Sequence, residues 1–282
     1  MAGYEELSSY PAIISYVQCT KKRDLTRFVS KKKSAKDTVN FSVAYNTNII
    51  LPLPTKWYVD LYIEQNMVTH FQYGEIEIEH LKRADKKLAV AIDRIGMIER
   101  AVIPDLFTAL VHSIIGQQIS TKAHQTVWGR METKLDEITP AIFDALPLDE
   151  LQQFGITFKK AANIKSVAHK IITGERDLDS LRAMPDEQVC AKLSEQDGIG
   201  VWTAEMLMIF SMQRLNVLSY GDLAILRGLR MVYHHRKIDK ATFNKYWKRY
   251  SPYASVASLY LWAVAGGAID EMKDYAPKKK KS

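Results

Sequence analysis

Asp222 is the acidic residue whose place in the sequence best suits chemistry. It stands directly before the apolar segment Leu223 to Tyr233, which predicts a helix, so its plainest role is that of an N-cap. The helix dipole and the free N–H groups of such a helix end favour the ionised carboxylate. A fixed anion of this kind stabilises a cationic transition state and orients or deprotonates an attacking water. The two roles are compatible, and the local pattern alone favours the cap.

A second chemical feature lies 22 residues upstream, at Gly198-Ile199-Gly200 in LSEQDGIGVWTAEMLMIF. Two glycines around one aliphatic residue predict a tight turn whose backbone can approach a ligand closely. The unpaired N–H groups of the following helix favour an anion, such as a nucleic-acid phosphate, and Ile199 is expected to anchor the turn in the core. An ordinary helical corner with a glycine stop is the alternative.

The elements that position these residues are predicted to be helices joined by short connections, which makes the chain mainly α and compact. Asp85 is expected to cap the first of them, and Pro104 is expected within the first turn of the next. The predicted helices are Lys86 to Ile98, Leu106 to Ile115, Thr121 to Met131, Pro140 to Leu146, Lys160 to Ile172, Val201 to Met212, Leu223 to Tyr233, Lys240 to Trp247 and Val256 to Val264.

The two ends of the chain differ from this helical body. Residues 1–73 combine lysine clusters with short β-prone stretches, and they predict either a small sheet-containing α+β domain or a poorly ordered extension. Residues 74–276 are expected to form the helical domain. Residues 277–282 form a basic tail, in which Lys278–Lys281 is expected to be solvated, with a phosphate contact as the alternative.

Composition excludes several classes of protein. The formal net charge of +7 fits a polyanionic partner, although it is also compatible with a merely soluble surface. Two distant cysteines, Cys19 and Cys190, exclude a disulfide framework, and the seven histidines show no metal-ligand spacing, so no metal site is predicted. No apolar run reaches the roughly 20 residues that span a bilayer, and a cytoplasmic location is the simplest expectation.

The order of these features resembles the helix-hairpin-helix DNA glycosylase superfamily. The resemblance rests on the glycine hairpin, on Thr203-Ala204 behind it, and on the aspartate one helix and one loop later. It implies a two-lobed helical body that binds double-stranded DNA through Gly198, Ile199, Gly200 and Thr203, with Asp222 as the catalytic residue. It also implies that hairpin carbonyls share a monovalent cation with a phosphate when DNA is bound. Asp197 departs from the family, which usually has proline there.

One position separates subclasses of this superfamily. Members that also cleave the strand carry a lysine nucleophile in the first turn after the hairpin, where this chain has Trp202. The four-cysteine cluster of the iron–sulfur branch is also absent from the sequence. The resemblance therefore implies simple hydrolysis, without strand cleavage.

Further motifs resemble the DNA-3-methyladenine glycosylase II branch. Ile114–Ser120, IIGQQIS, is similar to the branch's loop that enters the duplex, with Gln118 as the wedge beside Gln117. Trp202 and Trp262 match aromatic residues expected to stack on an electron-poor alkylated base. Leu223 and Met206 stand where the branch often has tyrosines.

The expected activity is the removal of alkylated purines such as 3-methyladenine and 7-methylguanine from DNA by a monomeric enzyme. Extrusion of the damaged base costs a few kcal/mol, which gives a gap-filling glutamine a clear purpose. Two alternatives remain open: a glycosylase for oxidised or deaminated bases, and a non-catalytic DNA-binding module that uses the hairpin alone.

Overall fold

The computed structural model describes residues 70–277, and the expectations for residues 1–69 and for the end of the basic tail lie outside them. Within 70–277 the chain forms twelve α-helices and one short 3-10 helix, with no strand, which confirms the mainly α prediction. None of these helices has the length and apolar character needed to cross a bilayer.

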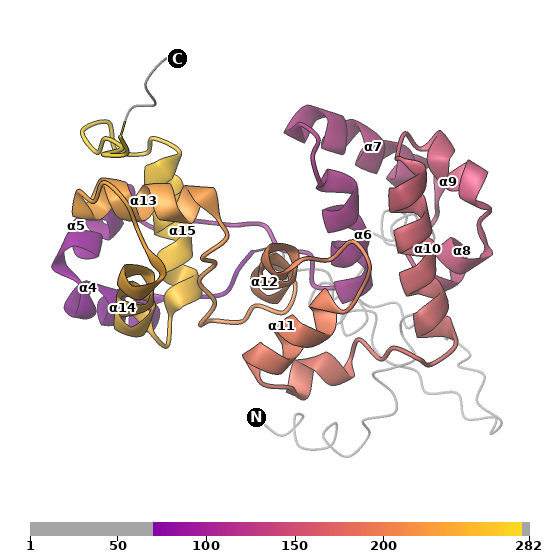
Figure 1. Cartoon of the computed structure of the whole chain (residues 1–282), viewed down its shortest axis with the longest axis horizontal. Helices are drawn as coiled ribbons and strands as arrows, with labels where there is room; N and C mark the ends of the chain where they lie inside the picture. The colour runs from indigo at the N-terminus through magenta and orange to yellow at the C-terminus, as the bar shows by residue number, and fades with distance from the viewer. Residues whose placement is uncertain (1–69, 278–282) are drawn as a thin grey trace, which may run out of the picture. The chain divides into compact units, whose positions relative to one another are not determined.

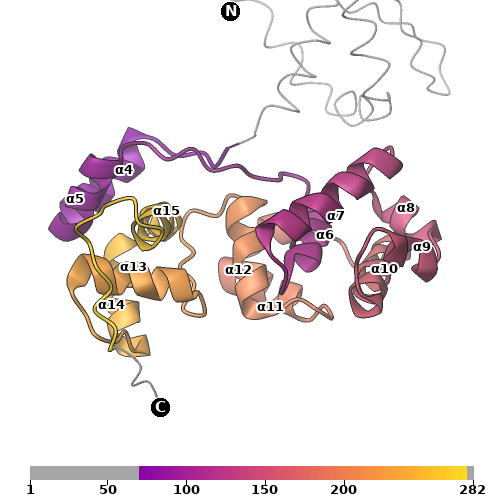
Figure 2. The same cartoon turned by 90° about the horizontal axis from the view of Figure 1, so that it is seen from above.

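The helices form two groups that the chain visits in the order first, second, first (Figures 1 and 2). The terminal lobe combines helices from both ends of the described chain, and helix α15 packs against α13, α5, α14 and α4. Its helices are α4 (Glu75–Ala84), α5 (Lys86–Ile95), α13 (Leu223–Tyr233), α14 (Lys240–Tyr250) and α15 (Ala254–Ala265).

The middle lobe is built from the continuous stretch between α5 and α13. Helix α10 packs against α8, α9 and α6, while α12 packs against α11 and α6. The helices of this lobe are α6 (Leu106–Gly116), α7 (Thr121–Lys134), α8 (Pro140–Ala145), α9 (Leu148–Gln153), α10 (Phe158–Ile172), α11 (Asp186–Ser194) and α12 (Val201–Phe210).

Aspartate caps set several helix starts as the sequence predicts. Asp85 caps α5 by accepting hydrogen bonds from the N–H groups of Lys87 and Leu88. The expectation for Pro104 is wrong: α6 begins at Leu106, because Asp105 supplies the cap and accepts from the N–H of Thr108.

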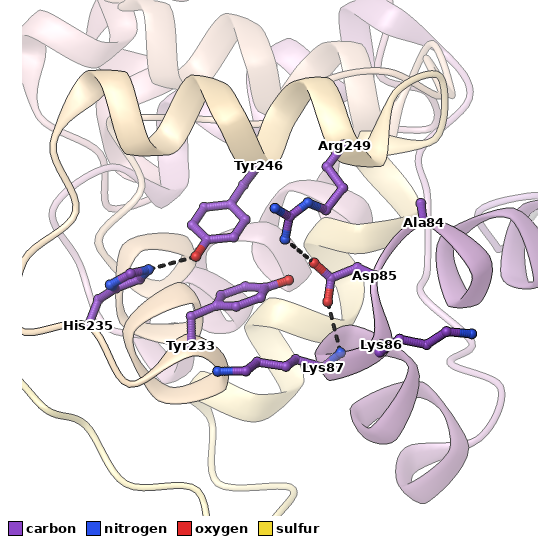
Figure 3. A pocket seen from close by; sticks show the side chains of 8 residues that line it. All are labelled: Ala84, Asp85, Lys86, Lys87, Tyr233, His235, Tyr246 and Arg249. Atoms are coloured by element: carbon purple, nitrogen blue, oxygen red, sulfur yellow. Dashed lines mark hydrogen bonds and ion pairs between the residues drawn. The ribbon is translucent and has the colours of Figure 1, made fainter.

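A polar cluster ties the start of α5 to the ends of α13 and α14. Asp85 is only 4% exposed, and its second carboxylate oxygen lies 2.6 Å from the guanidinium of Arg249. The ring of Tyr233 stacks on that of Tyr246 at 4.1 Å, and the Tyr246 hydroxyl is hydrogen-bonded to His235 (Figure 3). These groups line an open cavity of about 350 Å³, but their hydrogen bonds and ion pair are made within the protein, including that between the hydroxyls of Tyr233 and Tyr250. The cluster therefore has a structural role: it joins the three helices.

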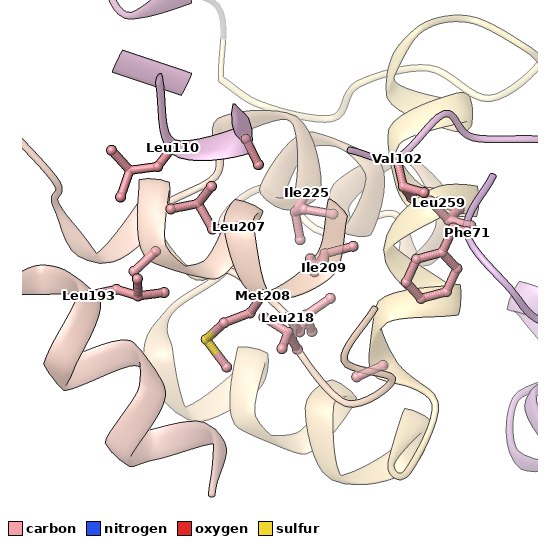
Figure 4. Packing of buried hydrophobic residues seen from close by; sticks show 14 of the residues in the cluster. Phe71, Val102, Leu110, Leu193, Leu207, Met208, Ile209, Leu218, Ile225 and Leu259 are labelled. Atoms are coloured by element: carbon pink, nitrogen blue, oxygen red, sulfur yellow. The ribbon is translucent and has the colours of Figure 1, made fainter. Parts of the chain in front are cut away.

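One hydrophobic cluster runs through both lobes (Figure 4). Helix α12 contributes Leu207 and Ile209, and α13 contributes Ile225. Gly228 allows α13 to approach α15 closely, since a Cβ at this position would lie 2.4 Å from the Leu261 carbonyl oxygen. The shared core holds the N-terminal ends of α12 and α13 in a defined relation, which matters for the side chains at those ends.

Candidate active site

Asp222 is a buried N-cap whose carboxylate accepts three hydrogen bonds. Its side chain is 7% exposed, and Oδ1 accepts hydrogen bonds from the N–H groups of Ala224 and Ile225 at 2.8 and 2.9 Å. Oδ2 accepts from the indole Nε1–H of Trp202 at 2.9 Å. Within the part of the chain that the structure describes, no cationic side chain forms an ion pair with Asp222. The predicted cap is confirmed, and the catalytic role stays a prediction.

Trp202, the second residue of α12, connects the middle lobe to this carboxylate. Its indole is 47% exposed, so one part of the ring holds Asp222 while the rest faces solvent. The neighbouring side chains Val201 and Leu223 are also largely exposed. The carboxylate thus lies beside the half-exposed Trp202 ring, and exposed apolar side chains flank both residues in sequence, which suits contact with the flat face of a base or sugar.

The glycine hairpin has the geometry that the sequence predicts. Gly198 adopts a left-handed φ of 84°, which L side chains rarely adopt, and a Cβ there would also displace the side-chain amide of Asn163, so the position favours glycine. Ile199 is buried. Gly200 is the N-cap of α12 and offers no side chain, which leaves the N–H groups of the first turn free for an anion. The Thr203 side chain is buried, so what this residue presents at the helix end is its backbone N–H.

The predicted wedge loop is joined directly to the hairpin. The side-chain amide of Gln117 donates to the carbonyl oxygen of Gly198 at 2.7 Å. Gln118 is exposed and adopts a left-handed φ of 56°, which an L side chain rarely adopts. The Gly198 carbonyl uses one of its two lone pairs for this hydrogen bond, and the cation that the resemblance implies for the DNA-bound hairpin stays a prediction.

Three titratable groups lie behind the wedge loop. The Lys160 ammonium donates to the carbonyl oxygens of Ile115 and Gln117 at 2.8 and 2.6 Å, so α10 fixes the end of α6. Burial lowers the pKa of Lys160, and burial with the nearby charge of His124 lowers the pKa of His112 to about 4. The imidazoles of His112 and His124 pack 4.1 Å apart, which supports a structural role.

Trp262 is placed apart from Trp202. Its ring lies 5.5 Å from that of Phe210, at the far end of α12, and it is partly buried against the core. Trp202 and Phe210 are eight residues apart, which is about 12 Å along a helix. The structure therefore joins Trp202 to Asp222 but records no ring contact between Trp202 and Trp262 in residues 70–277. A base-stacking role for Trp262 stays a prediction.

Sequence reasoning missed Glu205 and Ser219, a second polar pair beside Asp222. Ser219 is 1% exposed, and its hydroxyl donates to Glu205 Oε2 at 2.5 Å. A signal existed: Glu205 is the single charged residue in the otherwise apolar α12. A carboxylate in such a helix needs a partner, so Glu205 marks a polar contact.

Comparison with known proteins gives a consistent result. Residues 111–252 match the HhH-GPD superfamily of base excision DNA repair proteins. The chain is 32% identical to a DNA-3-methyladenine glycosidase of Bacillus halodurans, with a TM-score of 0.66 over 73% of this chain and 96% of that one. It is 26% identical to DNA-3-methyladenine glycosylase 1 of Schizosaccharomyces pombe, over 78% of this chain and 99% of the relative.

A structure of Schizosaccharomyces pombe 3-methyladenine DNA glycosylase in complex with abasic DNA shares the fold, with 23% identity and a TM-score of 0.61 over 68% of this chain and 97% of that one. The family match over residues 111–252 covers half of the chain and includes the hairpin and Asp222. It agrees with the helical two-lobed architecture. This chain belongs to the HhH-GPD superfamily of base excision DNA repair proteins.

Proposed function

We propose that this chain is a monofunctional DNA glycosylase that removes alkylated purines, such as 3-methyladenine and 7-methylguanine, by hydrolysing their N-glycosidic bonds. The names of the relatives from Schizosaccharomyces pombe and Bacillus halodurans support this substrate class. The observation that carries the proposal is the Asp222 carboxylate, held by three N–H donors beside the half-exposed indole of Trp202.

Asp222 suits the charge that develops during this reaction. As the base departs, positive charge builds on the sugar, and an anion fixed nearby stabilises that transition state without reorganising. The same carboxylate orients or deprotonates the attacking water. An alkylated purine already carries positive charge, so its departure needs little further activation.

The surroundings of Asp222 suit a flipped, cationic base in duplex DNA. The exposed part of the Trp202 ring offers a π face, to which a positively charged base is attracted. The free N–H groups of the first turn of α12 suit a backbone phosphate, and the exposed Gln118 suits the gap that the base leaves. The net charge of +7 supports a polyanionic partner.

We also propose that the chain acts as a monomer in the cytoplasm.

The product is expected to be an intact abasic site. A coupled strand cleavage needs an amine that attacks the sugar and forms a Schiff base. Trp202 occupies the place of that amine in the first turn of α12, and an indole nitrogen does not form Schiff bases.

The test is incubation of the wild-type chain with methylated duplex DNA, followed by identification of the released bases by mass spectrometry. Free 3-methyladenine and 7-methylguanine are expected, with strand breaks only after alkali treatment. Strand breaks without alkali would contradict the monofunctional mechanism. Duplex binding without release of any base would favour the non-catalytic alternative, and preferential release of oxidised or deaminated bases would correct the substrate class.

A further inference from the structure

Glu205 lies one helical turn beyond Trp202, and both side chains reach the same neighbouring segment. Trp202 donates to Asp222, and Glu205 accepts from Ser219. Residues three apart on a helix lie on one face, so α12 contacts the segment from Ser219 to Asp222 at two points. These contacts join the middle lobe to the residues that precede α13.

Ser219 belongs to the turn that presents Asp222. Its side chain is almost fully buried, and its carbonyl oxygen accepts from the N–H of Asp222 at 3.4 Å. A Cβ on Gly221 would lie 3.9 Å from both the Ser219 hydroxyl and the Cβ of Trp202. The Ser219 hydroxyl is therefore packed into the turn, and whatever holds this hydroxyl also holds the turn.

The charge around Glu205 explains why its partner matters. Burial raises the pKa of Glu205, the Ser219 hydrogen bond and the charge of Lys240 lower it, and the charge of Asp222 raises it. Burial raises the pKa of the Cys190 thiol in α11, and the nearby charge of Glu205 raises it further. A half-buried carboxylate near a second carboxylate is costly unless it makes a specific contact, and the contact it makes is with the Asp222 turn.

We propose that Glu205 is a positioning residue for base excision: through the Ser219 hydroxyl it fixes the turn that carries Asp222 against Trp202. Glu205 itself contacts neither substrate nor reacting atoms in this account. The inference rests on the proposed glycosylase function, because it assigns to Glu205 a role in the same site.

The first test measures single-turnover release of 7-methylguanine from a methylated duplex. Glu205→Ala and Ser219→Ala are each expected to slow release about tenfold, the loss typical of a hydrogen bond to a charged group. The double variant is expected to be no slower than Glu205→Ala, because both changes break one contact. Glu205→Gln retains a side-chain oxygen that can accept from Ser219 and is expected to recover most of the rate.

Measurements of DNA binding distinguish a loss of positioning from a general loss of structure. Affinity for a duplex with a tetrahydrofuran abasic-site analogue is expected to stay within about twofold, since the phosphate contacts are untouched. Glu187→Ala, which removes an exposed carboxylate from α11, is the matched control and is expected to leave rate and binding unchanged. Wild-type rates in Glu205→Ala, or additive losses in the double variant, would overturn the proposal, as would equal losses of rate and binding.

A second readout is independent of catalysis. In a ¹⁵N-labelled protein, the indole N–H resonance of Trp202, assigned by its absence from Trp202→Phe, reports the hydrogen bond to Asp222. Glu205→Ala and Ser219→Ala are expected to move this resonance, whereas Glu187→Ala is not. If the wild-type chain releases no base but Glu205→Ala and Ser219→Ala still move this resonance, the proposed function is refuted and the positioning contact is retained. Base release with an unmoved resonance would refute the positioning role alone. If Glu205→Ala does not fold, Glu205→Gln and Ser219→Ala carry both readouts.

Discussion

Asp85 and Asp222 are built alike and differ in one partner. Both are buried N-caps of terminal-lobe helices, and in each case one carboxylate oxygen accepts from two backbone N–H groups. The second oxygen of Asp85 meets the guanidinium of Arg249, while that of Asp222 meets the neutral indole of Trp202. A cation neutralises the first carboxylate, and the second keeps its charge for a substrate. The partner, and not the cap, separates a structural aspartate from a candidate catalytic one.

The largest effect on stability is expected at Asp85, whose charge is compensated by Arg249. Arg249→Met leaves Asp85 buried without its cation, which is expected to lower the free energy of unfolding by about 3 kcal/mol. Urea denaturation measures this loss. The exposed Arg94, which pairs with Glu271, provides the control, because Arg94→Met is expected to cost well under about 1 kcal/mol. Equal losses in the two variants would show that the Asp85 pair is not special.

Converting one aspartate site into the other tests the comparison from the opposite side. Trp202→Arg gives Asp222 a cationic partner like that of Asp85, and it is expected to slow base release about a hundredfold, because the carboxylate no longer offers its charge to the transition state. Single-turnover kinetics on methylated duplex DNA measure the effect. Release at the rate of Trp202→Phe would mean that the charge of Asp222 is not what matters.

A smaller effect is expected when the ring is kept and its N–H is removed. Trp202→Phe loses the hydrogen bond to Asp222 but retains an exposed aromatic face, so base release is expected to slow about tenfold. Binding of the abasic-analogue duplex is expected to remain unchanged. A loss in Trp202→Phe as large as that in Trp202→Arg would point to indole-specific contact with the base instead.

The smallest effect is expected on stability at Asp222, whose second carboxylate oxygen meets a neutral indole and not a cation. Asparagine caps helices about as well as aspartate, so Asp222→Asn is expected to change the free energy of unfolding by less than about 1 kcal/mol. Urea denaturation beside the wild type measures the difference. A loss of several kcal/mol would show that Asp222, like Asp85, is held for stability.

Local sequence pattern predicts much of the fold and part of the site. The bounds of α13, the caps at Asp85 and Asp222, and the hairpin around Ile199 follow from apolar spacing and from the residue types that helix ends and tight turns require. Pro104 lies two residues before α6 and not in its first turn, because the adjacent Asp105 makes the cap, and the sequence does not show which of these neighbours does so.

The contacts that organise the site join residues that are distant in sequence. Trp202 and Asp222 are 20 residues apart, and Gln117 and Gly198 are 81 apart. Such pairs depend on how the two lobes pack, which periodicity does not encode. The same limit hides the role of Glu205 in the sequence, because its partner Ser219 lies 14 residues away. The two aspartate caps look equivalent in sequence for this reason, since Arg249 lies 164 residues from Asp85.

The most direct test compares the two aspartates in one experiment. Asp222→Asn and Asp85→Asn are prepared in parallel, and single-turnover release of 7-methylguanine from methylated duplex DNA is measured per folded protein. Asp222→Asn is expected to slow release about a thousandfold, because both charge stabilisation and water activation are lost. Asp85→Asn is expected to stay within about twofold of the wild type, because that site is remote from the chemistry. Wild-type release by Asp222→Asn, or equal losses in the two variants, would contradict the account.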